Sequence, residues 1–246
     1  MSNGIKVKKR NGRGTEALNL EKMHKMVDEA TQGLAGVSAS QVEIQSGIQF
    51  YDGITTAEIQ EILIKSASDL IDLDHPNYQF VAARLLLFSI RKSLYGRSRE
   101  LPQLEDHIVK CVSQEVYDGD IYSKYSKEDI EKANGYIDHN RDFLFTYAGL
   151  RQVVDKYLVQ DRSTGQVYET PQFMYMMIAL TIFAEYPKET RLNYVRRYYD
   201  AISKHKINIP TPIMAGVRTP IRQFASCVLV DADDTLDSIF SSDMAI

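Results

Sequence analysis

The segment that most constrains the fold is Asn77–Gly96, which reads NYQFVAARLLLFSIRKSLYG. Apolar residues dominate it, and Pro76 stands immediately before it, where a proline suits the start of a helix. Gly96 can adopt the left-handed backbone conformation that commonly ends a helix. The segment therefore predicts one long apolar helix that ends at Gly96.

Signals for further helices precede this segment. Asn19 is a suitable N-cap for a helix that begins at Leu20, because apolar residues recur at helical spacing after it. A second helix opens at Ser38 or Ser40 and runs through Phe50. These signals predict two helices in the first fifty residues.

A capping box and a turn complete the first part of the chain. Thr55 and Glu58 have the spacing at which each side chain accepts a hydrogen bond from the other residue's backbone, which predicts a third helix. Asn11-Gly12 is typical of a tight turn between two short strands. Residues 1–96 therefore predict a compact unit of one hairpin and four helices.

The predicted hairpin is basic, although the whole chain has a net charge of −4. Its cations are Lys6, Lys8, Lys9, Arg10 and Arg13. A charged edge strand that resists aggregation has this composition. A phosphate site has it too, because cations beside helix N-termini suit polyphosphates. The residues alone leave both interpretations open.

Residues 101–205 continue the helical pattern with more polar residues. Ser126–Asp129 is a variant of the capping box that opens a helix. Residues 156–169 change period and predict a hairpin. Thr170-Pro171 supplies the N-cap and first residue of an apolar helix, and a further helix follows Pro187.

The region after residue 206 has a different texture, INIPTPIMAGVRTPIRQFASCVLVD, with prolines and two runs of β-forming residues. It predicts two short strands that flank an ordered loop, and Asp234–Asp237 opens a final helix. Buried strands need neighbours to complete their hydrogen bonds, and an unpaired hydrophobic edge promotes aggregation. The preceding sequence supplies no obvious partner strands, so we expect an incomplete domain.

Composition argues against several classes of function. A net negative charge argues against general binding of nucleic acids, which requires a basic face. No apolar stretch reaches the roughly eighteen residues of a membrane span, and the N-terminus lacks the pattern of a secretory signal. Two cysteines and five scattered histidines disfavour a disulfide framework and a protein-built metal site. These features predict a reducing, cytoplasmic environment.

The two cysteines lie in different settings. Cys111 follows His107 by four residues on a predicted helix, and we interpret the two as packed neighbours rather than as nucleophile and base. Cys227 lies in RQFASCVLVD and is either a small buried hydrophobe or a redox-active thiol. Disulfide chemistry needs a second thiol, so the residues alone leave the role of Cys227 open.

Three sets of motifs resemble one known family. PTPIM, GVRTP, RQF and SCVL, in this order and at these spacings, are similar to the strand–loop–strand that opens the catalytic barrel of the class I ribonucleotide reductase large subunit. Residues 1–96 are similar to the ATP-cone, the N-terminal regulatory domain of that family. YLVQ, TGQVYET and ETRLNYV resemble its helical region. The resemblance covers essentially the whole chain.

The resemblance implies an α+β fold that is mainly α, in three parts. We expect an ATP-cone of a β-hairpin and four helices over residues 1–96 and a helical region over residues 97–205. Residues 206–246 would form the first strands of an incomplete ten-stranded α/β barrel.

Roles follow by resemblance for residues near the end of the chain. Cys227 corresponds to one thiol of the redox-active pair that delivers electrons to the ribose. Thr211 and Ser226 correspond to residues that hold the nucleoside diphosphate substrate. The deoxynucleoside triphosphate that sets base specificity would bind at Asp234, Thr235 and Leu236.

Roles also follow for the cone. The positions that correspond to ATP-binding residues are Lys9, Glu16, Ala17, Leu18, Asn19, Leu20, Glu21, Lys22, Thr56 and Lys92. Gln60 and Ser89 stand where well-known members of the family have histidines. Histidine contacts help such a site to distinguish ATP from dATP, so the resemblance leaves inhibition by dATP open.

The resemblance further implies an oxidoreductase that makes deoxyribonucleotides by thiyl-radical chemistry. ATP and deoxynucleoside triphosphates would be allosteric effectors, and this chain would hold neither a metal nor a covalently bound cofactor. Neither a membrane nor a nucleic acid is expected as a partner.

The family's large subunit continues for several hundred residues beyond this point. We therefore expect a C-terminal large-subunit polypeptide, a small subunit with a di-iron or similar radical centre, and a thioredoxin- or glutaredoxin-type reductant as partners. We favour a split enzyme that is inactive without these partners over a truncated product. The alternative function is a stand-alone ATP-binding regulatory module.

Overall fold

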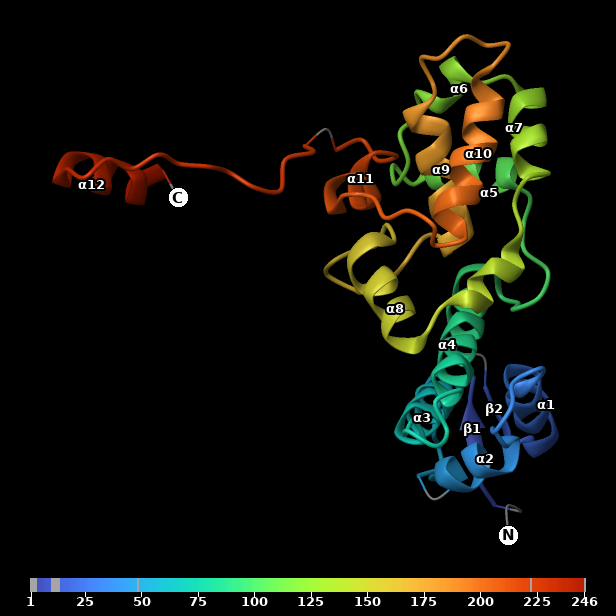
Figure 1. Ribbon diagram of the computed structural model, residues 1–246. Coiled ribbons are helices and arrows are strands. Elements are labelled where there is room, and N and C mark those ends of the chain that lie inside the picture. Colours follow the sequence, from blue (N-terminus) through green and yellow to red (C-terminus); the bar gives the residue numbers. More distant parts are fainter. Residues whose placement is uncertain (1–3, 10–13, 48, 222, 246) are drawn as a thin grey trace.

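The computed structural model describes residues 4–9, 14–47, 49–221 and 223–245. It is mainly helical, with one small two-stranded sheet. Figure 1 shows the sheet and α1–α3 at one end of the molecule and α5–α11 toward the other. Helix α4 runs from the first group to the second. The last residues extend away from the body as an arm that carries α12. The structure thus confirms a mainly α fold.

The first part of the chain forms the predicted hairpin and four helices. The elements are β1 (Lys6–Lys8), β2 (Thr15–Ala17), α1 (Leu20–Thr31), α2 (Ala39–Gly47), α3 (Thr56–Asp69) and α4 (Tyr78–Tyr95). The strands pair antiparallel, with Val7 opposite Glu16. The predicted turn Asn11-Gly12 lies outside the described residues, as do Arg10 and Arg13.

Local capping explains where these helices begin and end. The side chain of Asn19 caps α1, and Thr55 and Glu58 form the complete capping box of α3, as predicted. Gly96 ends α4 in the left-handed conformation, with φ of 74°, and its N–H donates to the Lys92 carbonyl at 2.9 Å. Gly is favoured there because it has no Cβ to clash.

The hairpin is fixed against the loop that precedes α3. The Lys8 N–H donates to the Ile54 carbonyl at 2.9 Å, and the Gly53 N–H donates to the Lys6 carbonyl at 2.8 Å. Val7, the middle residue of β1, is buried. These contacts hold β1 and β2 beside the N-terminal ends of α1 and α3.

The helical region contains two helices whose first residues the sequence predicted, α7 and α9. Its elements are α5 (Leu104–Ser113), α6 (Ile121–Lys124), α7 (Lys127–Asn134), a 3-10 helix (His139–Leu144), α8 (Tyr147–Gln152), a π-helical turn (Val153–Tyr157), α9 (Pro171–Ile182) and α10 (Arg191–Ser203). Ser126 and Asp129 form the capping box of α7. Thr170 is the N-cap of α9, and Pro171 occupies the first turn of that helix.

The hairpin predicted over residues 156–169 forms between Val159 and Tyr168, where the Tyr168 N–H donates to the Val159 carbonyl and the Asp161 N–H donates to the Gln166 carbonyl, each at 2.9 Å. The prediction is wrong only at its start. Residues up to Tyr157 belong to the π-helical turn, and the only bridge in the described part of this segment pairs Gln160 with Val167. The turn between them does form, because the Gly165 N–H donates to the Asp161 carbonyl at 2.8 Å. Helical packing of the residues before Leu158 overrides their β-type pattern.

The two strands predicted after residue 206 do not form in the described chain. Thr211–Gly216 forms the short helix α11, and residues 223–233 run without regular structure. A strand requires a neighbour to accept its backbone hydrogen bonds, and the described residues offer none beside this segment. The predicted final helix exists as α12 (Leu236–Ala245), capped by the side chain of Thr235, which accepts from the Ser238 N–H at 3.2 Å.

The buried side chains form one cluster that continues from the hairpin through α4 into the helical region. No helix within the described ranges is both long enough and apolar enough to cross a membrane.

We expect Thr55→Ala to reduce the free energy of unfolding by about 1 kcal/mol, because the hydrogen bond from the Glu58 N–H to the Thr55 hydroxyl is lost. Denaturant unfolding of the full chain measures this change. Glu61→Ala, at an exposed position inside the same helix, is the control and should change stability by only a few tenths. Equal losses in the two variants would contradict the capping assignment.

Candidate nucleotide site in the hairpin unit

A cavity of about 190 Å³ opens between β2, α1, α3 and the end of α4. We call it the hairpin cavity. It is lined by Val7, Glu16, Ala17, Leu18, Asn19, Lys22, Met23, Met26, Thr56, Ile59, Gln60 and Lys92. Seven of the ten residues predicted to bind ATP are in this lining, although they come from three separate stretches of sequence.

Two helix N-termini and one helix C-terminal turn meet at this cavity. Asn19 caps α1 by accepting the Lys22 N–H at 2.9 Å, and Thr56 is the first residue of α3. Lys92 lies in the last turn of α4. Helix N-termini carry partial positive charge, and two lysines add full charges. The hairpin cavity is therefore suited to a polyanion.

An ion pair organises the charge beside the cavity. Lys9 Nζ lies 3.0 Å from Glu16 Oε2. The hydrogen bond and charge of Lys9 hold the pKa of the Glu16 carboxyl below its ordinary value, and Lys22 and Lys92 lower it further. Glu16 thus remains ionised among three cations, and a phosphate group entering the cavity would compete with it for the lysines.

A second cavity of about 480 Å³ adjoins the first and shares Lys22, Met26, Gln60 and Lys92 with it. Its charged lining comprises the cations Lys22, Lys25, Lys92, Arg97 and Arg99 and the acids Glu29 and Glu100. Both acids are paired, because Arg99 Nη2 lies 2.6 Å from Glu29 and Arg97 Nη1 lies 2.5 Å from Glu100. Positive charge therefore exceeds negative charge along the joined cavities.

The sequence prediction missed Lys25, Arg97 and Arg99. Arg97 directly follows the helix-ending Gly96, and Arg99 comes two residues later. This clustering of cations after a C-cap was the signal that could have found the two arginines. Their approach to the cavity depends on how the chain folds back after α4.

Gln60 is one of the two residues that stand at positions where the resembled family has histidines. It lines both cavities. Its side chain is buried, and its Nε2 donates to the Leu85 carbonyl at 3.0 Å. Ser89 is also buried on α4. An amide cannot gain a proton as an imidazole does, so Gln60 offers a neutral contact at every ordinary pH.

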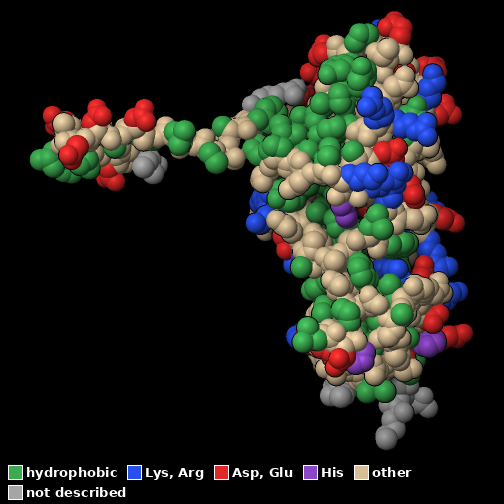
Figure 2. Space-filling model, viewed as in Figure 1, with side chains coloured by type: hydrophobic (Ala, Val, Ile, Leu, Met, Phe, Trp, Pro, Cys, Tyr) green, Lys and Arg blue, Asp and Glu red, His purple; other side chains and the backbone are tan. Residues whose placement is uncertain are grey.

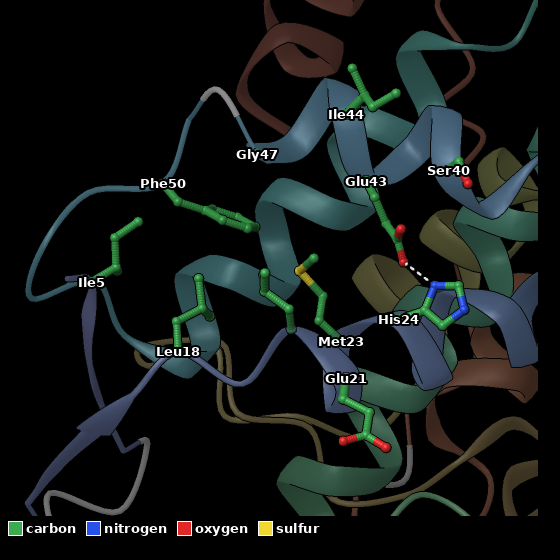
Figure 3. Close-up of a pocket in the computed structure, with 11 residues that line it drawn as sticks. Ile5, Leu18, Glu21, Met23, His24, Ser40, Glu43, Ile44, Gly47 and Phe50 are labelled. Atoms are coloured by element: carbon green, nitrogen blue, oxygen red, sulfur yellow. Dashed lines mark hydrogen bonds and ion pairs between the residues drawn. The ribbon is translucent and has the colours of Figure 1, made fainter. Parts of the chain in front are cut away.

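Leu20 and Glu21, two other predicted ATP-binding residues, line a different cavity of about 720 Å³. Figure 3 shows this cavity between the hairpin, α1 and the end of α2, with Phe50 and Ile44 among its apolar side chains. His24 Nδ1 and Glu43 Oε1 are 2.8 Å apart at its edge. Leu18 lines this cavity and the hairpin cavity.

The residues with predicted catalytic or substrate roles are spread over the last part of the chain. Thr211 begins α11 against the body, whereas Ser226 and Cys227 lie on the arm. Cys227 is exposed, and its Sγ is 3.8 Å from Ser226 Oγ. Asp234, Thr235 and Leu236 are exposed at the start of α12. The described chain does not bring these groups into one site.

Cys111, the other thiol, is buried in the helical region. Its Sγ lies 3.7 Å from His107 Nε2, and His107 stacks on Phe173 at 4.2 Å between ring centroids. Burial raises the pKa of the Cys111 thiol to about 12 and lowers that of His107 to about 3. A neutral thiol beside a neutral imidazole is unreactive, which agrees with the prediction of packed neighbours.

In the part of the chain that the structure describes, no three His, Cys, Asp or Glu side chains gather closely enough to hold a metal ion.

We expect Lys9→Met to raise the pKa of Glu16 toward its ordinary value, because Lys9 is the main cause of its depression. The pKa can be followed by carboxyl NMR titration of the full chain. Because the folded-state pKa is depressed, the pair stabilises the fold above the unfolded pKa and loses this effect as pH falls. Lys65→Met, which breaks the exposed Lys65–Asp69 pair, is the control and should leave Glu16 unchanged.

The chain matches two family models. Residues 5–93 match the ATP cone domain, and residues 143–222 match the ribonucleotide reductase all-alpha domain. It is 51% identical over all 246 residues to the ribonucleoside-diphosphate reductase 1 subunit alpha of Escherichia coli K12, and the match covers 32% of that protein.

Two other relatives agree. The subunit alpha of Haemophilus influenzae is 51% identical over the whole chain and 32% of its own length. That of enterobacteria phage T4 is 44% identical over 94% of the chain and 30% of its own length. The chain therefore spans about a third of the curated relatives that it matches. It belongs to the family of ribonucleotide reductase large subunits, and it corresponds to their N-terminal region.

Proposed function

We propose that the chain is the N-terminal, nucleotide-regulated part of a ribonucleoside-diphosphate reductase large subunit. The observation that carries this proposal is the 51% identity over the whole chain to proteins named as that subunit. The reductase converts ribonucleotides to deoxyribonucleotides by thiyl-radical chemistry. In this proposal residues 1–96 regulate, residues 97–205 support the substrate segment, and residues 206–246 join the catalytic barrel.

ATP binds in the hairpin cavity in this proposal. Its phosphates contact Lys22 and Lys92 and the N-termini of α1 and α3, and its base packs on the apolar side chains of Met23 and Met26. Lys9 acts through its pair with Glu16. The cationic surplus of the adjoining cavity supports a triphosphate over a neutral ligand.

Cys227 supplies one thiol of the redox pair, and the other comes from a polypeptide that completes the barrel. The two thiols form a disulfide and release two electrons and two protons, while the ribose loses one hydroxyl group as water. The exposure of Cys227 supports this role, because a disulfide partner must approach its sulfur to about 2 Å. Thr211 and Ser226 hold the substrate, and a thioredoxin- or glutaredoxin-type protein restores the thiols.

The arm, residues 223–246, is the segment that binds the completing polypeptide. It exposes apolar side chains, among them Val228, Leu229 and Phe240. It also holds five aspartates and no Lys, Arg or His, whereas residues 1–222 hold 28 acidic and 29 basic residues. Figure 2 shows acidic and hydrophobic side chains along the arm. These features support a partner surface that is apolar and basic.

The other expected components complete the proposal. Asp234, Thr235 and Leu236 bind the deoxynucleoside triphosphate that sets substrate choice, since α12 offers a helix N-terminus there. A separate small subunit with a di-iron or similar centre supplies the radical. The whole assembly acts in the cytoplasm.

We expect the double variant Lys22→Ala, Lys92→Ala to bind ATP at least tenfold more weakly than the unaltered chain, because both lysines line the joined cavities. Calorimetric titration of the full chain measures the affinity. Lys65→Ala, on the exposed side of α3, is the control for the loss of positive charge. Unchanged affinity in the double variant would exclude the hairpin cavity as the ATP site.

A reconstituted assay separates the reductase from the alternative of a stand-alone regulatory module. We expect nucleoside diphosphate reduction when the chain is combined with a completing polypeptide and a radical-generating small subunit, and none from the chain alone. Cys227→Ser should abolish turnover and leave ATP affinity unchanged. Activity that persists in Cys227→Ser would contradict the redox role, and ATP binding with no activity in any mixture would favour the module.

A further inference from the structure

A buried ion pair joins the Thr211 segment to the helical region. Arg218 Nε lies 2.9 Å from Glu169 Oε2 and 3.1 Å from Glu169 Oε1, and Arg218 Nη2 also contacts Oε1. Both side chains are 0% exposed. Arg218 is the middle residue of GVRTP and lies in the turn that follows α11. Glu169 lies two residues before the start of α9. A pair buried this completely requires a full set of partners.

Glu169 is held from the side of the helical region. Its Oε1 accepts the Val159 N–H at 2.7 Å, and its Oε2 accepts a hydrogen bond from the Tyr117 hydroxyl. The Tyr117 oxygen lies 3.1 Å from His107 Nε2, which belongs to the stacked core beneath α9. The Glu169 carboxylate is therefore held in a fixed position, and its two oxygens orient the guanidinium of Arg218.

Arg218 uses its remaining N–H groups on two other elements, α11 and the π-helical turn. Nη1 donates to the Met214 carbonyl of α11 at 2.5 Å, and Nη2 donates to the Tyr157 carbonyl at 2.8 Å. The Tyr157 hydroxyl lies 3.4 Å from Thr211 Oγ1. One side chain thus connects the helix that begins with Thr211 to the tyrosine that touches Thr211.

Tyr157 occupies an unusual piece of backbone. It ends the π-helical turn, and the Leu158 N–H donates to the Val153 carbonyl five residues earlier at 2.9 Å. Single π-helical turns cost more than α-helical ones and are frequent at functional sites. Arg218 caps the freed Tyr157 carbonyl, which keeps this turn and the tyrosine hydroxyl in place.

We propose that the Glu169–Arg218 pair is a positioning device that aligns the hydroxyls of Thr211 and Tyr157 toward the phosphates of the nucleoside diphosphate, with Tyr157 as a second hydroxyl donor. This inference rests on the proposed function, in which Thr211 holds the substrate. Hydroxyl groups suit phosphate oxygens, and their effect depends on alignment within a fraction of an ångström. In this proposal neither Glu169 nor Arg218 contacts the substrate itself.

Hydrogen exchange of the full 246-residue chain tests the positioning without any substrate. In Glu169→Gln and in Arg218→Lys, backbone amides of residues 211–219 should exchange at least tenfold faster, while those of α10 keep their rates. Arg191→Lys is the matched control, because Arg191 forms another buried pair, 2.6 Å from Asp129, away from α11. The positioning role of the Glu169–Arg218 pair would be overturned if the amides of residues 211–219 exchanged at the same rate in the unaltered chain and in both test variants. It would also be overturned if Arg191→Lys accelerated their exchange as much as the test variants do.

The reconstituted reductase tests the second half. Tyr157→Phe removes only one hydroxyl, and we expect a several-fold higher KM for the nucleoside diphosphate with kcat within twofold. Glu169→Gln should raise KM about tenfold, and Arg191→Lys should leave it unchanged. An unchanged KM in both test variants would overturn the substrate role. If the reconstituted reductase with the unaltered chain shows no turnover, the proposed function fails, and the substrate role of Tyr157 fails with it. The hydrogen exchange result still decides whether the Glu169–Arg218 pair positions residues 211–219.

Discussion

The structure depends on α4, because two consecutive residues of this helix belong to two different parts of the molecule. Lys92 lines the hairpin cavity, and Arg91 is buried against the helical region, where its Nη2 lies 2.9 Å from Asp142 Oδ2. Asp142 also accepts a hydrogen bond from Gln172 Nε2 at 2.9 Å. Removing one partner of a buried pair commonly costs about 3–5 kcal/mol, so the place where α4 meets the helical region is strongly determined.

Charge has different uses along the chain. Buried pairs such as Arg91–Asp142 and Glu169–Arg218 join elements distant in sequence, and each requires a partner that only the folded chain supplies. Surplus cations gather instead around the joined cavities near Lys22 and Lys92. The whole net negative charge lies on the arm, which makes no buried pair in the described chain. The buried pairs, the lining of the joined cavities and the arm thus use separate sets of charges.

Predictions that rest on local chemistry are confirmed. Asn19, the Thr55 capping box and Gly96 act within one helical turn, so their effect is readable without knowledge of the fold. Predictions that need distant partners are less reliable. The β-type pattern around Cys227 predicted strands, yet among residues 4–9, 14–47, 49–221 and 223–245 no neighbouring strand completes a ladder there. For the candidate site, the family motifs predicted Lys92 and Thr56, which both line the hairpin cavity, but they did not distinguish this cavity from the one that Glu21 lines.

The sequence by itself determined the longer helices, the caps at Asn19, Thr55 and Gly96, the hairpin and the family, because each depends on residue type at short spacing. Only the tertiary structure decided which side chains share a cavity, because Glu16, Thr56 and Lys92 meet through the packing of β2, α3 and α4. It alone paired Glu169 with Arg218, since no spacing rule links residues 49 positions apart. Burial makes such a pair obligatory, and burial is a property of the whole fold.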